Sequence, residues 1–294
     1  MENVTNICYL ELLNTIISNG REQICRNHKS LELIGNKTTI PMNQPLITLK
    51  GRNLGYKFAL AEAAWVLQGD NKVETLKPYS KIIEKFSDDG ITFFGAYGPP
   101  IVDQIEYIGR AFKKDLFTRR AVMSLWRLKP PESSDIPCTI SVQFLLRPNQ
   151  YNYLELDIIN YMRSSDAWLG IPYDWFTFSM LGAYLAIYLK AILKIELLLG
   201  DLTIMTGSQH LYINSFGYTL PIIKNLLTED EYSSESQELF KYEPIVLSQF
   251  EKPSDLIKHL NCLVKNKMCL SEISWLKELI PIWNDKEVKN EKDK

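Results

Sequence analysis

The sequence lacks the features that mark disulfide-rich, zinc-binding and polyanion-binding proteins. Its five cysteines include no CxxC pair, and its three histidines form no paired Cys/His spacing. Lys and Arg total 33 against 35 Asp and Glu, so the formal net charge of -2 offers no broad positive field for nucleic acid. We therefore expect free thiols in a reducing compartment, no bound metal and no nucleic-acid partner.

Long hydrophobic runs and a targeting segment are also missing. The first six residues, MENVTN, lack the basic and apolar regions of a signal peptide. The longest uncharged stretch, 175–189, has fifteen residues and contains Thr, Ser, Gly and Tyr. Because a membrane helix needs about 20 apolar residues, this stretch favours a buried core helix. We expect a cytoplasmic protein with no membrane segment.

The composition is that of an ordinary globular chain. Of 294 residues, 46% are hydrophobic and 23% are charged. No internal repeat or long linker divides the chain, which favours one catalytic domain over residues 1–283. Residues 284–294 are polar and poor in apolar side chains, so we expect a frayed tail there.

Hydrophobic periodicity predicts an α+β fold. Residues 57–68 have helical spacing and end at Gly69, and residues 153–162 are rich in β-forming side chains. A turn at 147–150 joins the latter to the preceding strand as a hairpin. The full prediction is helices at 57–68, 103–114, 173–193 and 209–227, the last interrupted by Pro221, with strands at 121–126, 139–147, 153–162 and 202–206.

Cys138 is a candidate nucleophile at the entrance of this hairpin. An isolated cysteine is most often an inert small apolar residue, because reaction requires the thiolate. The guanidinium groups of Arg119, Arg120 or Arg163 would lower the pKa of the thiol if the fold places them near it. The sequence alone does not place them there.

Five other polar residues also have two interpretations each. Glu62 lies between Ala61 and an apolar run, where an acid needs a reason. Asp174 precedes a long apolar helix and could simply be its N-cap. His210 could be a structural histidine, and the Arg119-Arg120 pair could be a helix-end or turn charge.

Several motifs in order resemble the thymidylate synthase superfamily over residues 26–212. They are Glu62 in AEAAWVLQGD, Tyr97 in FGAYG, the Arg119-Arg120 pair before a strand ending in Trp126, Pro137-Cys138, RSSDAWLGIP from Arg163, and TGSQHLY from Thr206. The resemblance implies a mixed β-sheet with helices packed against it, and a homodimer formed through a sheet face. It also implies 5,10-methylenetetrahydrofolate as cosubstrate.

The resemblance carries roles onto matching positions. Cys138 would attack C6 of a pyrimidine, Glu62 would order water and move protons, and Tyr97 would assist at C5. The 3′-hydroxyl would bind His210 and Tyr212. The 5′-phosphate would bind Arg26, Arg163 and Ser164, with Arg119 and Arg120 from the neighbouring subunit, and the folate site would include Asp166, Leu169, Gly170, Ile83 and Phe86. Arg21 is an alternative to Arg26, because the N-terminal match is loose.

Asp174 stands where thymidylate synthases keep an Asn that reads uracil. A carboxylate accepts from the amino group of cytosine and can stabilise a proton on N3. With Ile83 and Phe86 in place of the family's tryptophans, this pattern most resembles the cytidylate and deoxycytidylate hydroxymethylases. We therefore expect hydroxymethyl transfer to CMP or dCMP, the sugar being undetermined. The alternatives are an atypical thymidylate synthase and a non-catalytic nucleotide-binding protein.

Overall fold

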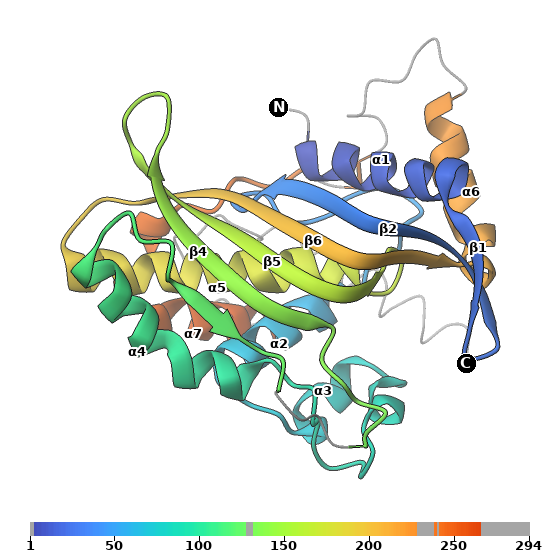
Figure 1. Cartoon of the computed structure of the whole chain (residues 1–294), viewed down its shortest axis with the longest axis horizontal. Coiled ribbons are helices and arrows are strands. Elements are labelled where there is room, and N and C mark those ends of the chain that lie inside the picture. The colour runs from blue at the N-terminus through green and yellow to red at the C-terminus, as the bar shows by residue number, and fades with distance from the viewer. Residues whose placement is uncertain (1–2, 128–131, 228–237, 240, 266–294) are drawn as a thin grey trace.

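The fold is built on one mixed six-stranded sheet (Figure 1). The computed structural model describes residues 3–127, 132–227, 238–239 and 241–265. Neighbouring strands are antiparallel except for the β5–β6 pair, which is parallel. The strands, in the order β1-β2-β6-β5-β4-β3, are β1 Arg21–Cys25, β2 His28–Pro41, β6 Leu198–Tyr212, β5 Leu154–Asp166, β4 Thr139–Pro148 and β3 Val122–Ser124.

Helices cover one face of this sheet. The longest, α5, packs on β5 and β6, and α2 and α7 pack on α5 (Figure 1). The helices are α1 Val4–Asn19, α2 Tyr56–Leu67, α3 Val73–Leu76, α4 Gly98–Lys114, α5 Ile171–Leu193, α6 Phe216–Leu227 and α7 Pro253–Val264. A sheet with segregated helices is an α+β fold, so the predicted fold class is confirmed.

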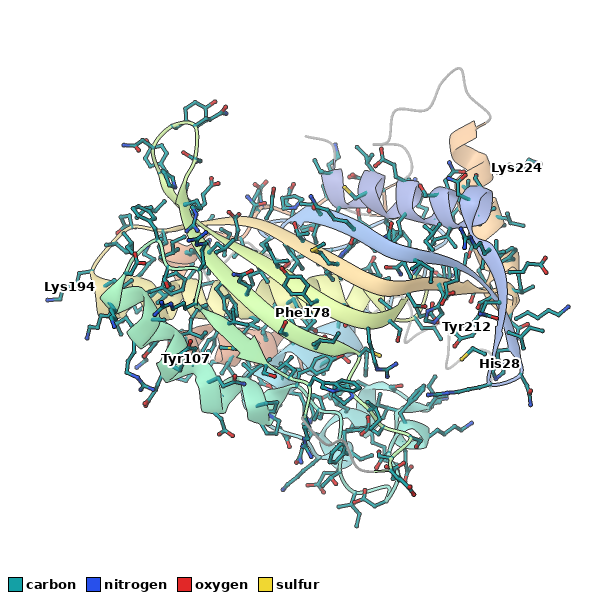
Figure 2. The ribbon with its side chains drawn as sticks, viewed as in Figure 1. His28, Tyr107, Phe178, Lys194, Tyr212 and Lys224 are labelled. Carbon is teal, nitrogen blue, oxygen red and sulfur yellow. The ribbon has the colours of Figure 1, made fainter. Side chains whose placement is uncertain are left out.

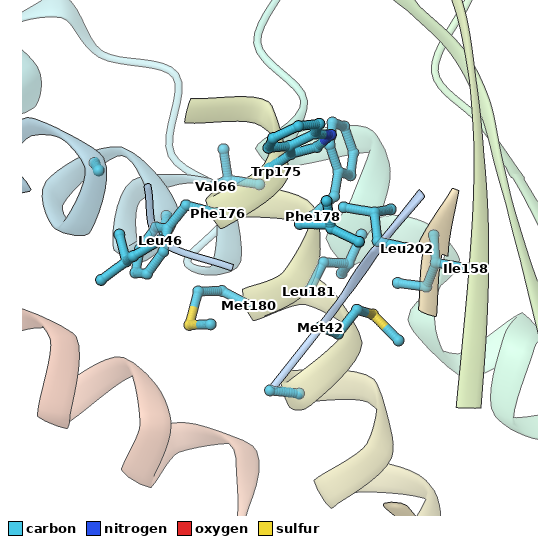
Figure 3. Close-up of a cluster of buried hydrophobic side chains, with 14 of the residues drawn as sticks. Met42, Leu46, Val66, Ile158, Trp175, Phe176, Phe178, Met180, Leu181 and Leu202 are labelled. Atoms are coloured by element: carbon cyan, nitrogen blue, oxygen red, sulfur yellow. The ribbon is translucent and has the colours of Figure 1, made fainter. Parts of the chain in front are cut away.

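Helix α5 is the centre of the core. Its start carries Pro172, whose fixed φ suits the first turn of a helix. Trp175, Phe176 and Phe178 are each fully buried against side chains from α2, β5 and β6 (Figure 3). In the described part of the chain it is the one helix long and apolar enough to cross a membrane, yet 67% of its apolar window is buried in the protein. The helix predicted at 173–193 begins two residues earlier than expected, and it is a core helix.

The β4–β5 hairpin lies where it was predicted, but the strand and the helix that follow α5 differ from the prediction. Strands β4 and β5 pair antiparallel, and Cys138 immediately precedes β4. The short strand expected at 202–206 extends over 198–212, so the helix predicted to begin at 209 is wrong for its first residues. Residues 209–212 pair with β2 along one edge of β6, and Gln209 and His210 also pair with β5 along its other edge. The helix begins only at Phe216 and contains Pro221.

The second face of the sheet is open and partly apolar. Burial alternates along β5, with core-facing side chains such as Ile158 fully buried. On the open face the exposed fractions are 37% for Val122, 40% for Ile140 and 41% for Met205. An apolar open sheet face fits the predicted use of this face for dimerisation, which stays a prediction.

The thiols differ in state. Cys8, Cys25 and Cys138 are free, whereas Cys262 is disulfide-bonded. The expectation of free thiols throughout is therefore wrong at Cys262, because cysteine spacing alone does not define pairing. The predicted frayed tail at 284–294 lies outside the described residues.

Candidate active site

Cys138 lies just before β4, and Arg163 of β5 fixes it through backbone and side-chain hydrogen bonds. The Arg163 backbone N–H donates to the Cys138 carbonyl at 2.8 Å. Its guanidinium donates from Nε to the Pro137 carbonyl at 3.0 Å and from Nη2 to the Ile136 carbonyl at 3.0 Å. Nη1 donates to Ser164 Oγ at 3.1 Å, and that oxygen lies 3.8 Å from Cys138 Sγ. Arg163 thus braces the loop that presents the thiol.

Burial and Arg163 act in opposite directions on the thiol. Burial raises the pKa of Cys138, and the Arg163 guanidinium offsets part of the rise. The charge of Asp174 raises the pKa further, while the Ser164 hydroxyl and Arg26 lower it. The expected effect of a nearby guanidinium is therefore confirmed for Arg163, but burial exceeds it and the net shift of the thiol pKa is upward. A thiol of this kind needs a proton acceptor in the site before it can attack.

Glu62 and Asp174 form a carboxyl pair across one pocket. Burial raises the pKa of Glu62 to about 8, and the charge of Asp174 adds to it, while the Thr177 hydroxyl lowers it. Burial raises the pKa of Asp174 to about 7, and the Ser165 hydroxyl offsets part of that. Because the groups interact, their protons belong to the pair, which retains a proton near neutral pH.

Asp174 is not the helix cap. The N-cap of α5 is Gly170, and Asp174 lies within the first turn, where its backbone N–H donates to the Gly170 carbonyl at 3.0 Å. Its carboxyl oxygen is close to Gly170, since a Cβ on that glycine would lie 3.4 Å from Asp174 Oδ2. The simple capping explanation of this acid is therefore wrong. An acid near a helix N-terminus is still favoured by the helix dipole.

Tyr97 lies between the thiol and the carboxyl pair. Its hydroxyl accepts a hydrogen bond from the Thr139 backbone N–H at 3.3 Å, next to Cys138. Its ring packs against Phe178 with centroids 5.7 Å apart. Burial, together with the nearby Cys138 and Asp174, raises the pKa of Tyr97 well above its usual value. Tyr97 is therefore a neutral hydroxyl that can donate a hydrogen bond.

The pocket joins these polar groups to an apolar wall. Glu62, Tyr97 and Asp174 line it together, and so does Asp135, which the sequence analysis did not single out. Its position three residues before Cys138 was the available signal. The other lining residues are Trp65, Val66, Leu76, Ile83, Phe86, Phe93, Gly95, Ala96 and Thr177. Ile83 and Phe86 lie on the apolar wall of this pocket, and their contact with folate stays a prediction.

The motif from Asp166 forms the turn between β5 and α5. Asp166 Oδ1 accepts from the backbone N–H groups of Trp168 at 2.7 Å and Leu169 at 3.1 Å. The Gly170 N–H donates to the Asp166 carbonyl at 3.0 Å. The charge of Asp166 acts on Asp174, so this turn and the carboxyl pair are neighbours. Leu169 is 57% exposed and free to contact a ligand.

His210 and Tyr212 lie at the end of β6 with ring centroids 5.1 Å apart. His28, which sequence reasoning missed, packs edge-on to Tyr212 at 5.9 Å (Figure 2). Arg26 forms the adjoining turn with a φ of 49° and acts on both Cys138 and Tyr212. Arg21 pairs with Glu32 at the other end of the β1–β2 hairpin. The geometry favours Arg26 over Arg21.

Arg119 and Arg120 are not brought to Cys138 within the chain. Both are exposed and precede β3, and their carbonyls accept hydrogen bonds from Gln143 and Tyr107. Gln143 pairs with Val122 several residues along β4 from the thiol. The cationic side chains that lower the pKa of the Cys138 thiol are instead Arg163 and Arg26.

Comparison with known proteins places this site in a family. The thymidylate synthase family model matches residues 7–252. The deoxyuridylate hydroxymethyltransferase of Bacillus phage SP01 is 28% identical over 234 residues, covering 71% of this chain and 57% of that protein. This chain thus spans little more than half the length of that relative. The thymidylate synthase of Wigglesworthia glossinidia brevipalpis is 28% identical over 219 residues, covering 70% of this chain and 79% of that protein. The chain belongs to the thymidylate synthase family, whose members transfer one-carbon units to pyrimidine nucleotides with methylenetetrahydrofolate as cosubstrate.

Proposed function

We propose that this protein transfers a hydroxymethyl group from 5,10-methylenetetrahydrofolate to C5 of a cytidine monophosphate, either CMP or dCMP. The observation that carries the proposal is the carboxyl group of Asp174, which lines the pocket beside Glu62 and Tyr97. Its pKa is raised to about 7, mainly by burial. A group with that pKa can hold or release a proton at neutral pH.

A carboxyl group in this position suits cytosine better than uracil. Cytosine offers an amino group as donor and an unprotonated ring nitrogen, whereas uracil offers a carbonyl and an N–H. The carboxyl of Asp174 can accept from the amino group and share a proton with N3 as the ring is attacked. That proton neutralises the charge that develops when a thiolate adds to C6.

The positions of the other residues support the roles proposed for them. Cys138 adds to C6, which converts C5 into an enamine-like carbon; covalent addition divides a difficult substitution into easier steps. The Cys138 proton needs an acceptor, and the Glu62–Asp174 pair is the titratable group acting in the same site. The neutral hydroxyl of Tyr97 lies next to Cys138 and is placed to assist proton removal at C5.

The binding groups fit a nucleoside monophosphate beside a flat cosubstrate. Arg163, Ser164 and Arg26 surround the thiol loop and suit a phosphate, and His210 with Tyr212 suits the sugar. Ile83 and Phe86 give the pocket an apolar wall for an aromatic ring, and Asp166, whose charge acts on Asp174, offers an acceptor. When bound, the folate would supply the one-carbon unit as an electrophilic methylene.

Two features support hydroxymethyl over methyl transfer. Ile83 and Phe86 replace the bulky aromatic wall of the methyl-transferring branch, and Phe86 is 55% exposed, so water can reach this side of the pocket. One relative is itself a hydroxymethyltransferase. That relative acts on deoxyuridylate, so hydroxymethyl transfer to dUMP is the second candidate function, followed by an atypical thymidylate synthase.

We also propose a homodimer in which the partner subunit supplies Arg119 and Arg120 to the phosphate. These side chains are exposed. They lie beside Gln143 of β4, several residues along that strand from Cys138 of their own chain. The open sheet face with Ile140 and Met205 would be buried in such a dimer. The arrangement would complete the set of cations around the phosphate.

The test is incubation with CMP, dCMP, UMP and dUMP in turn, each with methylenetetrahydrofolate, and mass spectrometry of the products. We expect a hydroxymethyl adduct of one cytidine nucleotide and tetrahydrofolate as the folate product. Dihydrofolate with a methylated uridylate would instead show methyl transfer. Absence of product and of C5 tritium release from all four nucleotides would indicate a non-catalytic protein.

A further inference from the structure

Asp135 is an acid in the pocket to which the family resemblance assigns no role. Its carboxylate lines the pocket with Glu62 and Asp174. Oδ2 accepts from the Gly95 backbone N–H at 3.0 Å. A Cβ on Gly95 would lie 2.6 Å from Asp135 Oδ1, so the approach requires glycine at this position. The carboxylate is therefore fixed against the loop that leads to Tyr97.

The negative charge of Asp135 is not needed for its hydrogen bond with the Gly95 backbone N–H. An amide side chain would accept from Gly95 equally well and would avoid the cost of a half-buried charge. Burial raises the pKa of Asp135, the backbone N–H groups of Gly95 and Phe94 offset part of the rise, and the charge of Asp88 adds to it. The side chain also faces the apolar wall that includes Phe86. A charge maintained at such a cost in a pocket indicates a chemical role.

We propose that Asp135 binds the water that adds to the one-carbon unit on the nucleotide and accepts its proton. This inference rests on the proposed function. After the folate leaves, the ring carries an exocyclic methylene at C5 and the Cys138 sulfur at C6. The water oxygen bonds to the methylene carbon while one of its protons moves to Asp135. The electron pair released toward C5 re-forms the C5–C6 double bond and expels the thiolate, which regains a proton.

The alternative is that Asp135 only positions the loops that carry Tyr97 and Cys138. Asp135→Asn separates the two roles, because the amide oxygen still accepts from Gly95 but does not take a proton from water. Asp89→Asn is the matched control. Asp89 likewise accepts from backbone N–H groups, those of Ile91 and Thr92, but it is exposed and does not line this pocket.

The experiment compares C5 tritium release with hydroxymethyl product in each variant. For Asp135→Asn we expect the ratio of product to tritium release to fall at least about tenfold, as for loss of a general base. With 2-mercaptoethanol present, the stalled methylene should be captured as a thioether of the nucleotide, seen by mass spectrometry. Asp89→Asn should keep the wild-type ratio and give no thioether.

Two results would overturn the inference. If product and tritium release fall together in Asp135→Asn, with no thioether, Asp135 acts by positioning. If neither changes, the carboxylate is dispensable. The proposed function fails separately, when the wild-type protein itself releases no tritium or forms no hydroxymethyl product.

Discussion

At the scale of single residues, the site depends first on Cys138. We expect Cys138→Ala to abolish both C5 tritium release and product formation while the far-ultraviolet circular dichroism stays unchanged. Removal of a covalent nucleophile costs several orders of magnitude in rate, and a half-buried thiol contributes little to packing here. Substantial turnover by this variant would show that the thiol is structural.

Asp174 determines the expected choice of base. In Asp174→Asn the side chain can donate to O4 and accept from N3–H, which are the groups that uracil presents. We expect cytidylate turnover to fall at least about tenfold, equivalent to about 1.4 kcal/mol, and tritium release from a uridylate to rise or appear. Turnover on all four nucleotides measures the change. An unaltered base preference in a stable variant would contradict the assignment to cytosine.

Glu62 should make the stability of the protein depend on pH. Its pKa rises from an ordinary value of 4.5 to about 8 on folding, mainly through burial. Between these values the native state holds more protons than the unfolded state, so the free energy of unfolding falls as the pH rises. We expect Glu62→Gln to be more stable than the wild type at pH 8, by about 4 kcal/mol, and not at pH 4.

Denaturant unfolding at both pH values measures this difference. Glu84→Gln is a suitable control. Glu84 is an exposed acid in an ion pair with Lys77, and such a pair contributes little to the free energy of unfolding at either pH. An equal effect of Glu62→Gln at both pH values would show that the carboxyl is ionised without cost in the folded protein.

There is a physical reason why some residues of the site could be predicted from the sequence and others could not. Glu62, Tyr97 and Asp174 were predicted for the site, and they line one pocket. Asp135 and His28 were missed, because their proximity to the site comes from loops and a hairpin that no local pattern specifies. The net direction of the thiol pKa shift could not be predicted, because burial, which depends on tertiary packing, exceeds the effect of Arg163.

At the scale of elements, local signals sufficed where local contacts decide the structure. The β4–β5 hairpin has β-forming residues on both sides of a short turn, and it was predicted. Strand β6 was underestimated because it pairs with β2 and β5, which lie far away in the sequence. Strand preference at 209–212 therefore comes from non-local pairing and burial rather than from residue type.

The contact of α5 with the strand layer depends on Gly182. A Cβ there would lie 2.5 Å from Met42 Sδ and 3.1 Å from Ile158 Cδ1. We expect Gly182→Val to lower the free energy of unfolding by about 1 to 3 kcal/mol through overpacking. Gly217→Ala in α6 is the control, since a Cβ there meets nothing within 4 Å, and better helix propensity should leave it equal or more stable. Chemical denaturation of both variants provides the test, and an unaffected Gly182→Val would show that the layers can separate freely.

At the scale of the whole molecule, the separation of Arg119 and Arg120 from Cys138 leads to a prediction about assembly. In a two-fold dimer each site would combine Cys138 from one subunit with the two arginines from the other. Arg120→Ala and Cys138→Ala homodimers should then each be nearly inactive. In a hybrid of the two, the site with an intact Cys138 receives intact arginines from the partner. Random exchange makes half of the dimers hybrids with one good site of two, so about a quarter of wild-type activity should return.

The control mixes Arg120→Ala subunits with Arg120→Ala/Cys138→Ala subunits, which can form no complete site in any combination. Native mass spectrometry should verify that hybrids form, and activity should follow their fraction. If hybrids form and no activity returns, the arginines act within their own chain or not at all. The structure makes action within one chain difficult, because the Arg119 carbonyl is fixed by Gln143, several residues along β4 from the thiol. Recovery of activity in the hybrids would therefore indicate that the open sheet face is the dimer interface and that residues of both subunits form the phosphate site.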